Sequence, residues 1–199
     1  MEPKKYPVVL SIAGSDCSAG AGIQADLKSA AACGAYCLTA ITAVTAQNTQ
    51  GVRGIEIVSD DMIRAQLDTL SDDIAVDAVK LGMLPSAGAV ELSAEAIERW
   101  GCGSVVLDPV MVSTSGHMLV TPEVAQRIVE RLLPLALLAT PNISEAEFIS
   151  GERIVSEADF GKAARRFEAL GCRALLLKGG HLEQAELTDT LFDFRTGET

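Results

Sequence analysis

Residues that can do chemistry follow short apolar runs of the sequence, each at the point where a run ends. Asp108, Asn142 and Lys178 stand just after three of these runs, and a glycine-rich loop that begins at Gly14 stands after the first. The runs occupy residues 8–13, 78–81, 104–107, 135–139 and 174–177. Because ligands of parallel sheets bind beyond the carboxyl ends of the strands, these residues are predicted to gather at one rim.

Two carboxylates on this rim suit a magnesium ion. Asp108 ends a buried run, where a carboxylate must be hydrated, paired or close to a metal. Glu145 lies three residues after Asn142, and this spacing equally predicts a capping box that closes the start of a helix. Mg²⁺ keeps most of its waters and needs only one or two carboxylates, so Glu145 can cap the helix and also lie beside metal-bound water. Asn142 would then help to orient nucleotide phosphates.

Two glycine-containing segments suit a ligand that approaches the backbone closely. Lys178 precedes Gly179 and Gly180, and a cation beside glycine amides is typical of a phosphate site. The alternative is a lysine that only extends from a strand end into solvent. The loop from Gly14 to Gly22 matches neither the Walker pattern nor the dinucleotide fingerprint, and on its own it can equally be a flexible strand-to-helix turn.

Asp26 and Gln47 together predict a site for a nitrogen heterocycle. Asp26 is expected in the first turn of the helix after the glycine loop, where the helix dipole alone explains a carboxylate. Gln47 ends the apolar run 38–46. Its amide offers the donor and the acceptor that a ring nitrogen and an adjacent amine require. Taken alone, Gln47 would be a solvated loop residue.

Helices predicted between the runs must position these residues. Apolar side chains recur at helical spacing within residues 63–70, 90–97, 124–132 and 160–170. Thr121 before Pro122 predicts a helix start, and Ser156 with Asp159 resembles a capping box. Strands that alternate with helices predict an α/β fold with a mostly parallel central sheet and helices on both faces.

The composition fits one ordered domain over residues 1–199. The chain has 48% hydrophobic and only 4% aromatic residues, so its core must be aliphatic. A net charge of -11 argues against a nucleic-acid or anionic-membrane surface. The five cysteines are scattered without a CxxC pair, and the N-terminus lacks a signal-peptide core, which together predict a cytoplasmic protein with reduced thiols.

Seven segments, in order along the chain, resemble the hydroxymethylpyrimidine/phosphomethylpyrimidine kinases of thiamine biosynthesis, which are ribokinase-like enzymes. They are Ser-Ile-Ala-Gly-Ser-Asp16, Gly-Ile-Gln-Ala-Asp-Leu27, Thr-Ala-Gln-Asn48, Val-Lys-Leu-Gly-Met83, Leu-Asp-Pro-Val-Met111, Thr-Pro-Asn142 with Glu145, and Leu-Lys-Gly-Gly-His181. The resemblance implies a ribokinase-like fold. It also implies ATP- and Mg²⁺-dependent phosphorylation of 4-amino-5-hydroxymethyl-2-methylpyrimidine (HMP), and then of its monophosphate.

The same resemblance implies roles for individual positions and for partners. The residues implied to bind the pyrimidine are Gly14, Asp26, Gln47, Met83 and Val110, of which Met83 and Val110 would pack on the ring. The residues implied to serve ATP are Asn142, Glu145 and Lys178, and those implied to organise Mg²⁺ are Asp108 and Glu145. The resemblance implies a small-molecule substrate and a homodimer. Neither nucleic acid nor a membrane is expected as a partner.

The sequence departs from the family pattern at three places. Ala19 replaces a glycine of the usual loop, which would restrict the loop if this position needs a positive φ. His117 stands where the family usually has Asp. Family members continue past the strand at 189–194 to a Gly-Thr-Gly-Cys segment that supplies an anion hole and the proposed base. The chain is therefore expected to be C-terminally truncated, to contain no catalytic base, and to turn over poorly.

Two alternative functions remain open at this point. A pyridoxine or pyridoxal kinase of the same superfamily acts on a related hydroxymethyl heterocycle, although Gln47 favours the aminopyrimidine. A non-catalytic pyrimidine-binding module would keep the ring site without the anion hole.

Overall fold

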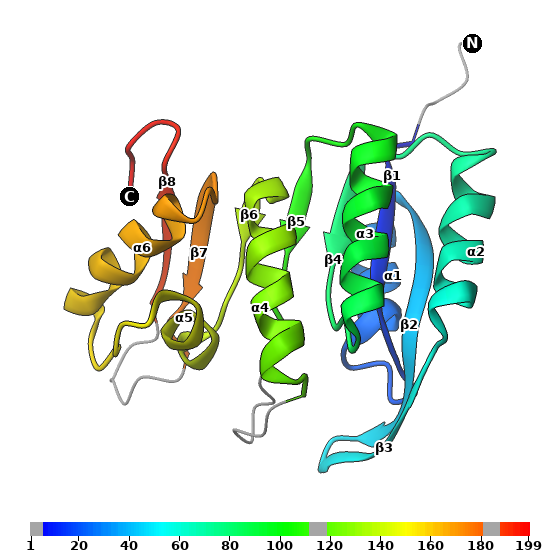
Figure 1. Ribbon diagram of the computed structural model, residues 1–199, viewed down its shortest axis with the longest axis horizontal. Helices are drawn as coiled ribbons and strands as arrows, with labels where there is room; N and C mark the ends of the chain where they lie inside the picture. The colour runs from blue at the N-terminus through cyan, green and yellow to red at the C-terminus, as the bar shows by residue number, and fades with distance from the viewer. Residues whose placement is uncertain (1–5, 112–118, 181–187) are drawn as a thin grey trace. The chain divides into compact units, whose positions relative to one another are not determined.

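The computed structural model describes residues 6–111, 119–180 and 188–199. The chain divides into two compact units, Met1–Ser104 and Val105–Thr199, each with its own strands and helices (Figure 1). The α/β class and the mostly parallel strands are as predicted. A single domain over residues 1–199 stays a prediction. No helix among the described residues is long and apolar enough to cross a bilayer.

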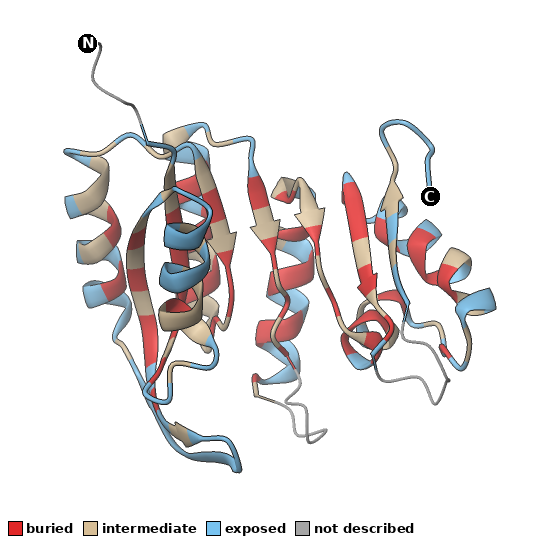
Figure 2. Cartoon of the chain, turned by 180° about the vertical axis from the view of Figure 1, so that it is seen from behind, coloured by how far each residue is buried: buried red, intermediate tan, exposed pale blue. Residues whose placement is uncertain are grey.

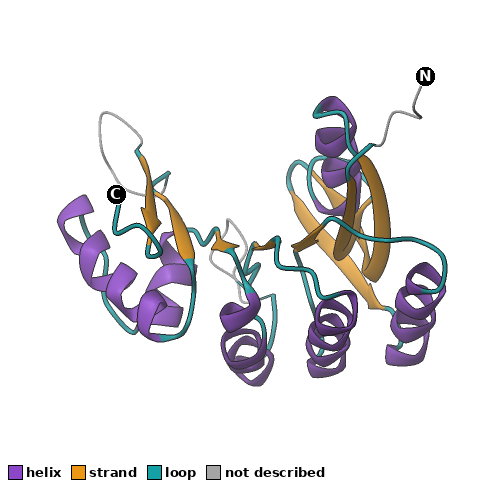
Figure 3. Ribbon diagram, turned by 90° about the horizontal axis from the view of Figure 1, so that it is seen from above, coloured by secondary structure: helices purple, strands orange, loops and turns teal. Residues whose placement is uncertain are grey.

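The first unit orders its strands β3-β2-β1-β4. Its elements are β1 (Val8–Asp16), α1 (Gly22–Ala32), β2 (Tyr36–Asn48), β3 (Gly51–Ile57), α2 (Asp60–Ser71), β4 (Ala78–Leu81) and α3 (Ala87–Trp100). β1 pairs in parallel with β2 and β4, and β3 is antiparallel to β2. α1 covers one face of these strands, and α2 and α3 cover the other (Figure 3), as predicted.

The second unit orders its strands β5-β6-β7-β8. Its elements are β5 (Val105–Leu107), α4 (Pro122–Arg131), η1 (Leu133–Leu135), β6 (Leu138–Ala139), α5 (Ile143–Ser150), η2 (Glu157–Asp159), α6 (Phe160–Ala169), β7 (Ala174–Lys178) and β8 (Asp189–Asp193). β5, β6 and β7 are parallel, and β8 is antiparallel to β7. The three α-helices lie on the same side of the strands (Figures 1 and 3).

How far the residues of a strand are buried depends on whether one or both faces of the strand are covered (Figure 2). In β1, residues 10–14 are all buried, as expected for a strand packed on both faces. In β5 and β7, buried side chains such as Leu107 and Leu177 alternate with half-buried ones such as Val106 and Leu176. This alternation fits helices packed on one face.

Two local predictions are wrong. The expected strand at 135–139 is only Leu138–Ala139, because the chain first forms a 3₁₀ turn that contains Pro134, a residue unable to donate to a ladder. Ser156 does not cap a helix. Its hydroxyl instead contacts the carboxylate of Asp159, the last residue of η2, at 3.3 Å. The predicted cap at Thr121 is confirmed, since its hydroxyl accepts the N–H of Val124.

The glycine loop requires left-handed backbone at two positions. Gly22 has φ of 57°, and a Cβ there would lie 2.3 Å from the carbonyl oxygen of Gly14, so only glycine fits. Ala19 has φ of 60° and is the only non-glycine residue with a positive φ in the described ranges. The position where Ala19 replaces the family's glycine is therefore a strained one.

Replacing Ala19 with glycine is expected to stabilise the protein. Glycine removes the left-handed strain, and after its entropic cost in the unfolded chain the net gain is about 1 kcal/mol. Urea titration of Ala19→Gly against the parent measures this change. Ala35→Gly is the matched control: its φ is not positive, so it should lose about 0.5–1 kcal/mol. A loss of stability in Ala19→Gly would contradict the strain assignment.

Candidate active site

The carboxylate of Asp16 closes the glycine loop at the end of β1. It is only 3% exposed and accepts the N–H groups of Ser18 (2.8 Å), Gly20 (3.1 Å) and Ala21 (2.9 Å). The Ser18 hydroxyl adds a fourth donor at 2.8 Å. Burial opposes ionisation, but the bonds from Ser18, Ala21 and Gly20 outweigh it and hold the pKa of Asp16 below its usual value. Asp16 thus serves the amino end of α1, whose N-cap Ala21 has no side-chain acceptor.

Gln24 on α1 also stabilises the start of this loop, through hydrogen bonds of its side-chain amide. Its side-chain oxygen accepts the N–H of Asp16 at 2.9 Å, and its amide nitrogen donates to the Ser15 hydroxyl at 2.7 Å. Both ends of the Gln24 amide are therefore committed to the loop.

Gln47 lies near the end of β2, not in a loop, and its backbone is held against the glycine loop. The Cys17 thiol lies 3.1 Å from the carbonyl oxygen of Gln47 and 3.4 Å from its nitrogen. The side-chain oxygen of Gln47 lies 3.2 Å from the hydroxyl of Thr45. The half-buried amide of Gln47 is thereby fixed at the carboxyl rim of the first unit.

Gly14 and Met83 lie together at the same rim. A Cβ on Gly14 would lie 3.0 Å from the terminal methyl carbon of Met83, so the absence of a side chain makes room for the methionine. The carbonyl of Met83 accepts the buried hydroxyl of Thr42 at 2.7 Å. The structure therefore brings these two predicted residues together.

The predicted place of Asp26 in the first turn of α1 is wrong. Asp26 is the fifth residue of that helix, and no acidic residue occupies the first turn. Its carboxylate accepts the Ser11 hydroxyl at 2.6 Å and pairs with Lys80 at 3.0 Å. Asp26 on α1 is therefore held in a half-buried ion pair with Lys80 of β4.

The second unit gathers its predicted residues at the carboxyl ends of β5 and β7. Lys178 Nζ lies 3.0 Å from Asp108 Oδ1, which also accepts the Thr140 hydroxyl at 3.3 Å. Asn142 forms a parallel bridge with Lys178. Val110 follows β5, and its N–H donates to the carbonyl of Asp108 at 2.8 Å. A cation, a carboxylate and an amide therefore share this rim, as predicted.

Glu145 forms the capping box with Asn142 that the sequence predicts. Asn142 Oδ1 accepts the N–H of Glu145, and Glu145 Oε2 accepts the N–H of Asn142, both at 2.9 Å. Burial to 2% exposure is the main cause that raises the pKa of the Glu145 carboxyl, and the nearby charge of Asp108 adds to the rise. The N–H of Asn142 and the ammonium of Lys178 oppose it. A cation bound nearby would favour the ionised carboxylate.

Asp108 and Glu145 fit a magnesium ion held largely through water and phosphate oxygens. Within the described ranges, no three His, Cys, Asp or Glu side chains lie close enough to bind a metal. The other oxygen of Glu145 accepts the N–H of Met111, so this carboxylate would act through metal-bound water. His117 and His181 lie outside the described residues.

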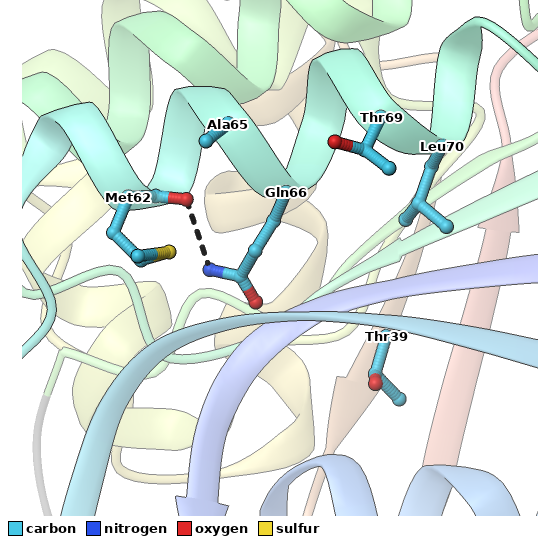
Figure 4. A pocket seen from close by; sticks show the side chains of 6 residues that line it. All are labelled: Thr39, Met62, Ala65, Gln66, Thr69 and Leu70. Atoms are coloured by element: carbon cyan, nitrogen blue, oxygen red, sulfur yellow. Dashed lines mark hydrogen bonds between the residues drawn. The ribbon is translucent and has the colours of Figure 1, made fainter.

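A cavity of about 320 Å³ lies between α2 and β2 of the first unit (Figure 4). It is lined by Thr39, Met62, Ala65, Gln66, Thr69 and Leu70. Gln66 bonds the N–H and the carbonyl of Ile41, at 2.8 and 3.0 Å, and so covers an open stretch of the β2 edge. None of the chemistry-bearing residues reaches this cavity, which is a packing feature of the first unit.

Sequence reasoning missed Asp16 and Thr45 as organising residues. Asp16 could have been found, because an Asp followed two residues later by Ser is typical of an Asx turn. Thr45 could not, since its hydroxyl reaches the carbonyl of Ser15 only through the pairing of β1 with β2.

The family model described as phosphomethylpyrimidine kinase matches residues 16–199. The chain belongs to the phosphomethylpyrimidine kinase family. It is 46% identical over 187 residues to a hydroxymethylpyrimidine/phosphomethylpyrimidine kinase of Rhizobium meliloti, covering 94% of this chain and 70% of that protein. It is 45% identical to the thiamine biosynthetic bifunctional enzyme TH1 of Arabidopsis thaliana, covering 96% of this chain but only 37% of the plant enzyme.

Solved structures agree with this family assignment. Phosphomethylpyrimidine kinase from Clostridium difficile superposes with a TM-score of 0.88 at 41% identity, covering 94% of this chain and 81% of that one. An ADP complex of Bacillus subtilis pyridoxal kinase superposes with a TM-score of 0.86 at 40% identity, covering 98% of this chain and 72% of that one. The ribokinase-like expectation for this family member is confirmed.

Asp26→Asn is expected to weaken the fold and to leave ligand affinity unchanged. The substitution removes the charge that pairs with Lys80, and a hydrogen bond to a charged group contributes about 1.5–3 kcal/mol. Urea unfolding and isothermal titration with HMP measure the two effects on the same sample. Loss of HMP affinity without loss of stability would instead restore Asp26 to the pyrimidine site.

Proposed function

We propose that this protein transfers the γ-phosphoryl group of ATP to the hydroxymethyl oxygen of HMP, and then to the phosphate of the monophosphate. In the first reaction an O–P bond forms on the substrate, the bond between the β-bridging oxygen and the γ-phosphorus breaks, and ADP and a proton leave. The observation that carries this proposal is the Gln47 amide, fixed at the rim of the first unit beside the glycine loop.

The first unit supplies the pyrimidine side of the proposed site. The Gln47 amide offers donors and an acceptor to the ring nitrogen and the exocyclic amine. Met83 offers an apolar, polarisable surface to the ring, and Gly14 lets the backbone come close to it. The family resemblance also implies that Val110 packs on the ring. The closed glycine loop holds these groups in place before the substrate arrives.

The second unit supplies the ATP side. Lys178 is proposed to bind phosphate oxygens, and its pairing with Asp108 holds the ammonium at the strand end until then. Asn142 is proposed to orient the phosphates from the start of α5. Magnesium, when bound, would neutralise phosphate charge beside Asp108, with Glu145 acting through metal-bound water. These residues position and neutralise, which is most of what phosphoryl transfer requires from a protein.

We also propose that the protein works in a reducing compartment, the cytoplasm, and as a homodimer. All five cysteines are free thiols, which agrees with such a compartment. Exposed apolar side chains on β2 and β3, among them Val44, Ile55 and Ile57, support self-association.

Gln47→Ala tests the proposed function directly. Losing the amide is expected to raise the dissociation constant for HMP by about 10- to 100-fold, because two hydrogen bonds to the ring disappear. Isothermal titration with HMP and with pyridoxine, followed by an assay of ADP release with ATP and Mg²⁺, gives the result. Gln50→Ala is the matched control, since Gln50 lies in the exposed turn after β2.

Two outcomes would contradict the proposal. Unchanged HMP affinity in Gln47→Ala would remove the pyrimidine site from this rim. Tighter binding and faster phosphorylation of pyridoxine by the parent protein would favour a pyridoxine kinase.

A further inference from the structure

We infer that Thr45 is a positioning residue that sets the orientation of the Gln47 amide and thereby the selectivity for an aminopyrimidine. The inference rests on the proposed function and deepens it. Thr45 is not expected to touch the substrate; it acts through Gln47.

The contacts of Thr45 carry the inference. The residue is 6% exposed, and its hydroxyl oxygen lies 3.0 Å from the carbonyl oxygen of Ser15 and 3.2 Å from Gln47 Oε1. Both neighbours are acceptors, so the single hydroxyl proton is shared between them. The hydroxyl therefore holds the oxygen end of the Gln47 amide inward, and the NH₂ end is left to face the ligand.

The backbone around Thr45 is shaped to make this contact. The register between β1 and β2 shifts between Ala13 and Ser15, and that between β2 and β3 shifts between Ala46 and Gln47. Such irregularities re-aim side chains and occur often beside active sites. Here they lie on both sides of Thr45 and bring its hydroxyl to Ser15 and Gln47 at once.

A fixed amide distinguishes ligands by their pattern of donors and acceptors. With its NH₂ facing outward, Gln47 donates to an unprotonated ring nitrogen, and the second lone pair of its oxygen can accept from the adjacent amine. Without the Thr45 hydroxyl, the side-chain amide of Gln47 can rotate about its terminal torsion, and its oxygen and NH₂ ends exchange places. The site then loses its preference for the nitrogen-amine pair, while an analogue that lacks this pair loses little.

The test compares Thr45→Val, which keeps the branched shape, with Thr45→Ser, which keeps the hydroxyl. Thr45→Val is expected to raise the dissociation constant for HMP by about 3- to 10-fold and that for pyridoxine by less than about 2-fold. Thr45→Ser is expected to restore parental selectivity. Thr39→Val on the same strand, at the cavity of Figure 4, is the control and should change neither value.

A double-mutant cycle separates positioning from general damage. Thr45→Val also deprives the Ser15 carbonyl of its donor, which lowers stability with or without Gln47. If Thr45 acts through Gln47, Thr45→Val has no further effect on HMP affinity in a Gln47→Ala background. An equal fold-change in both backgrounds would overturn the inference and leave the proposed function intact. Absence of HMP binding by the parent protein would overturn both.

The parent protein alone gives a second readout should Thr45→Val fail to fold. The side-chain NH₂ of Gln47 is expected to show restricted motion by ¹⁵N relaxation without ligand, in contrast to the exposed Gln50. Equal mobility of the two amides would overturn the inference.

Discussion

The carboxylate of Asp16 is the constraint on which the pyrimidine side of this protein depends. A buried carboxylate at a strand end must find donors, and it finds them in the loop that follows it, at Ser18, Gly20 and Ala21. The loop is thereby wrapped around Asp16, and the next residue, Cys17, is placed against the backbone of Gln47. One local set of hydrogen bonds therefore fixes the start of α1 and the position of Gln47, the residue proposed to bind the pyrimidine.

The second unit also has a carboxylate at a strand end, but different groups stabilise it. Asp108 also stands at the carboxyl end of a strand, but a cation, Lys178, neutralises it in place of a ring of amides. The roles proposed for the two groups, phosphate binding by Lys178 and metal binding by Asp108, start from this ion pair. Glu145 differs again, because it is buried in a capping box and its pKa is raised by that burial. Hydrogen bonds or an ion pair fix the position of each carboxylate, and the chemistry proposed for it depends on that position.

The sequence predicted those features that depend on local order. Strand ends located Asp108 and Lys178 at one rim of the second unit, because the ends of parallel strands lie at the same edge of a sheet, and the spacing of Asn142 and Glu145 predicted their capping box. It could not predict that Asp26 is taken up by Lys80, since that pairing depends on the register of β1 with β4. The backbone angle at Ala19 could not be predicted either, because a residue type alone does not fix φ.

If Asp16 forms the loop before any ligand binds, hydrogen-deuterium exchange of the ligand-free protein will show it. We expect the amides of Ser18, Gly20 and Ala21 to exchange slowly in the parent and at nearly unprotected rates in Asp16→Ala. The core amides of β1, such as that of Ile12, should remain protected in both. Equal exchange of the loop amides in the two proteins would show that Asp16 does not hold the loop.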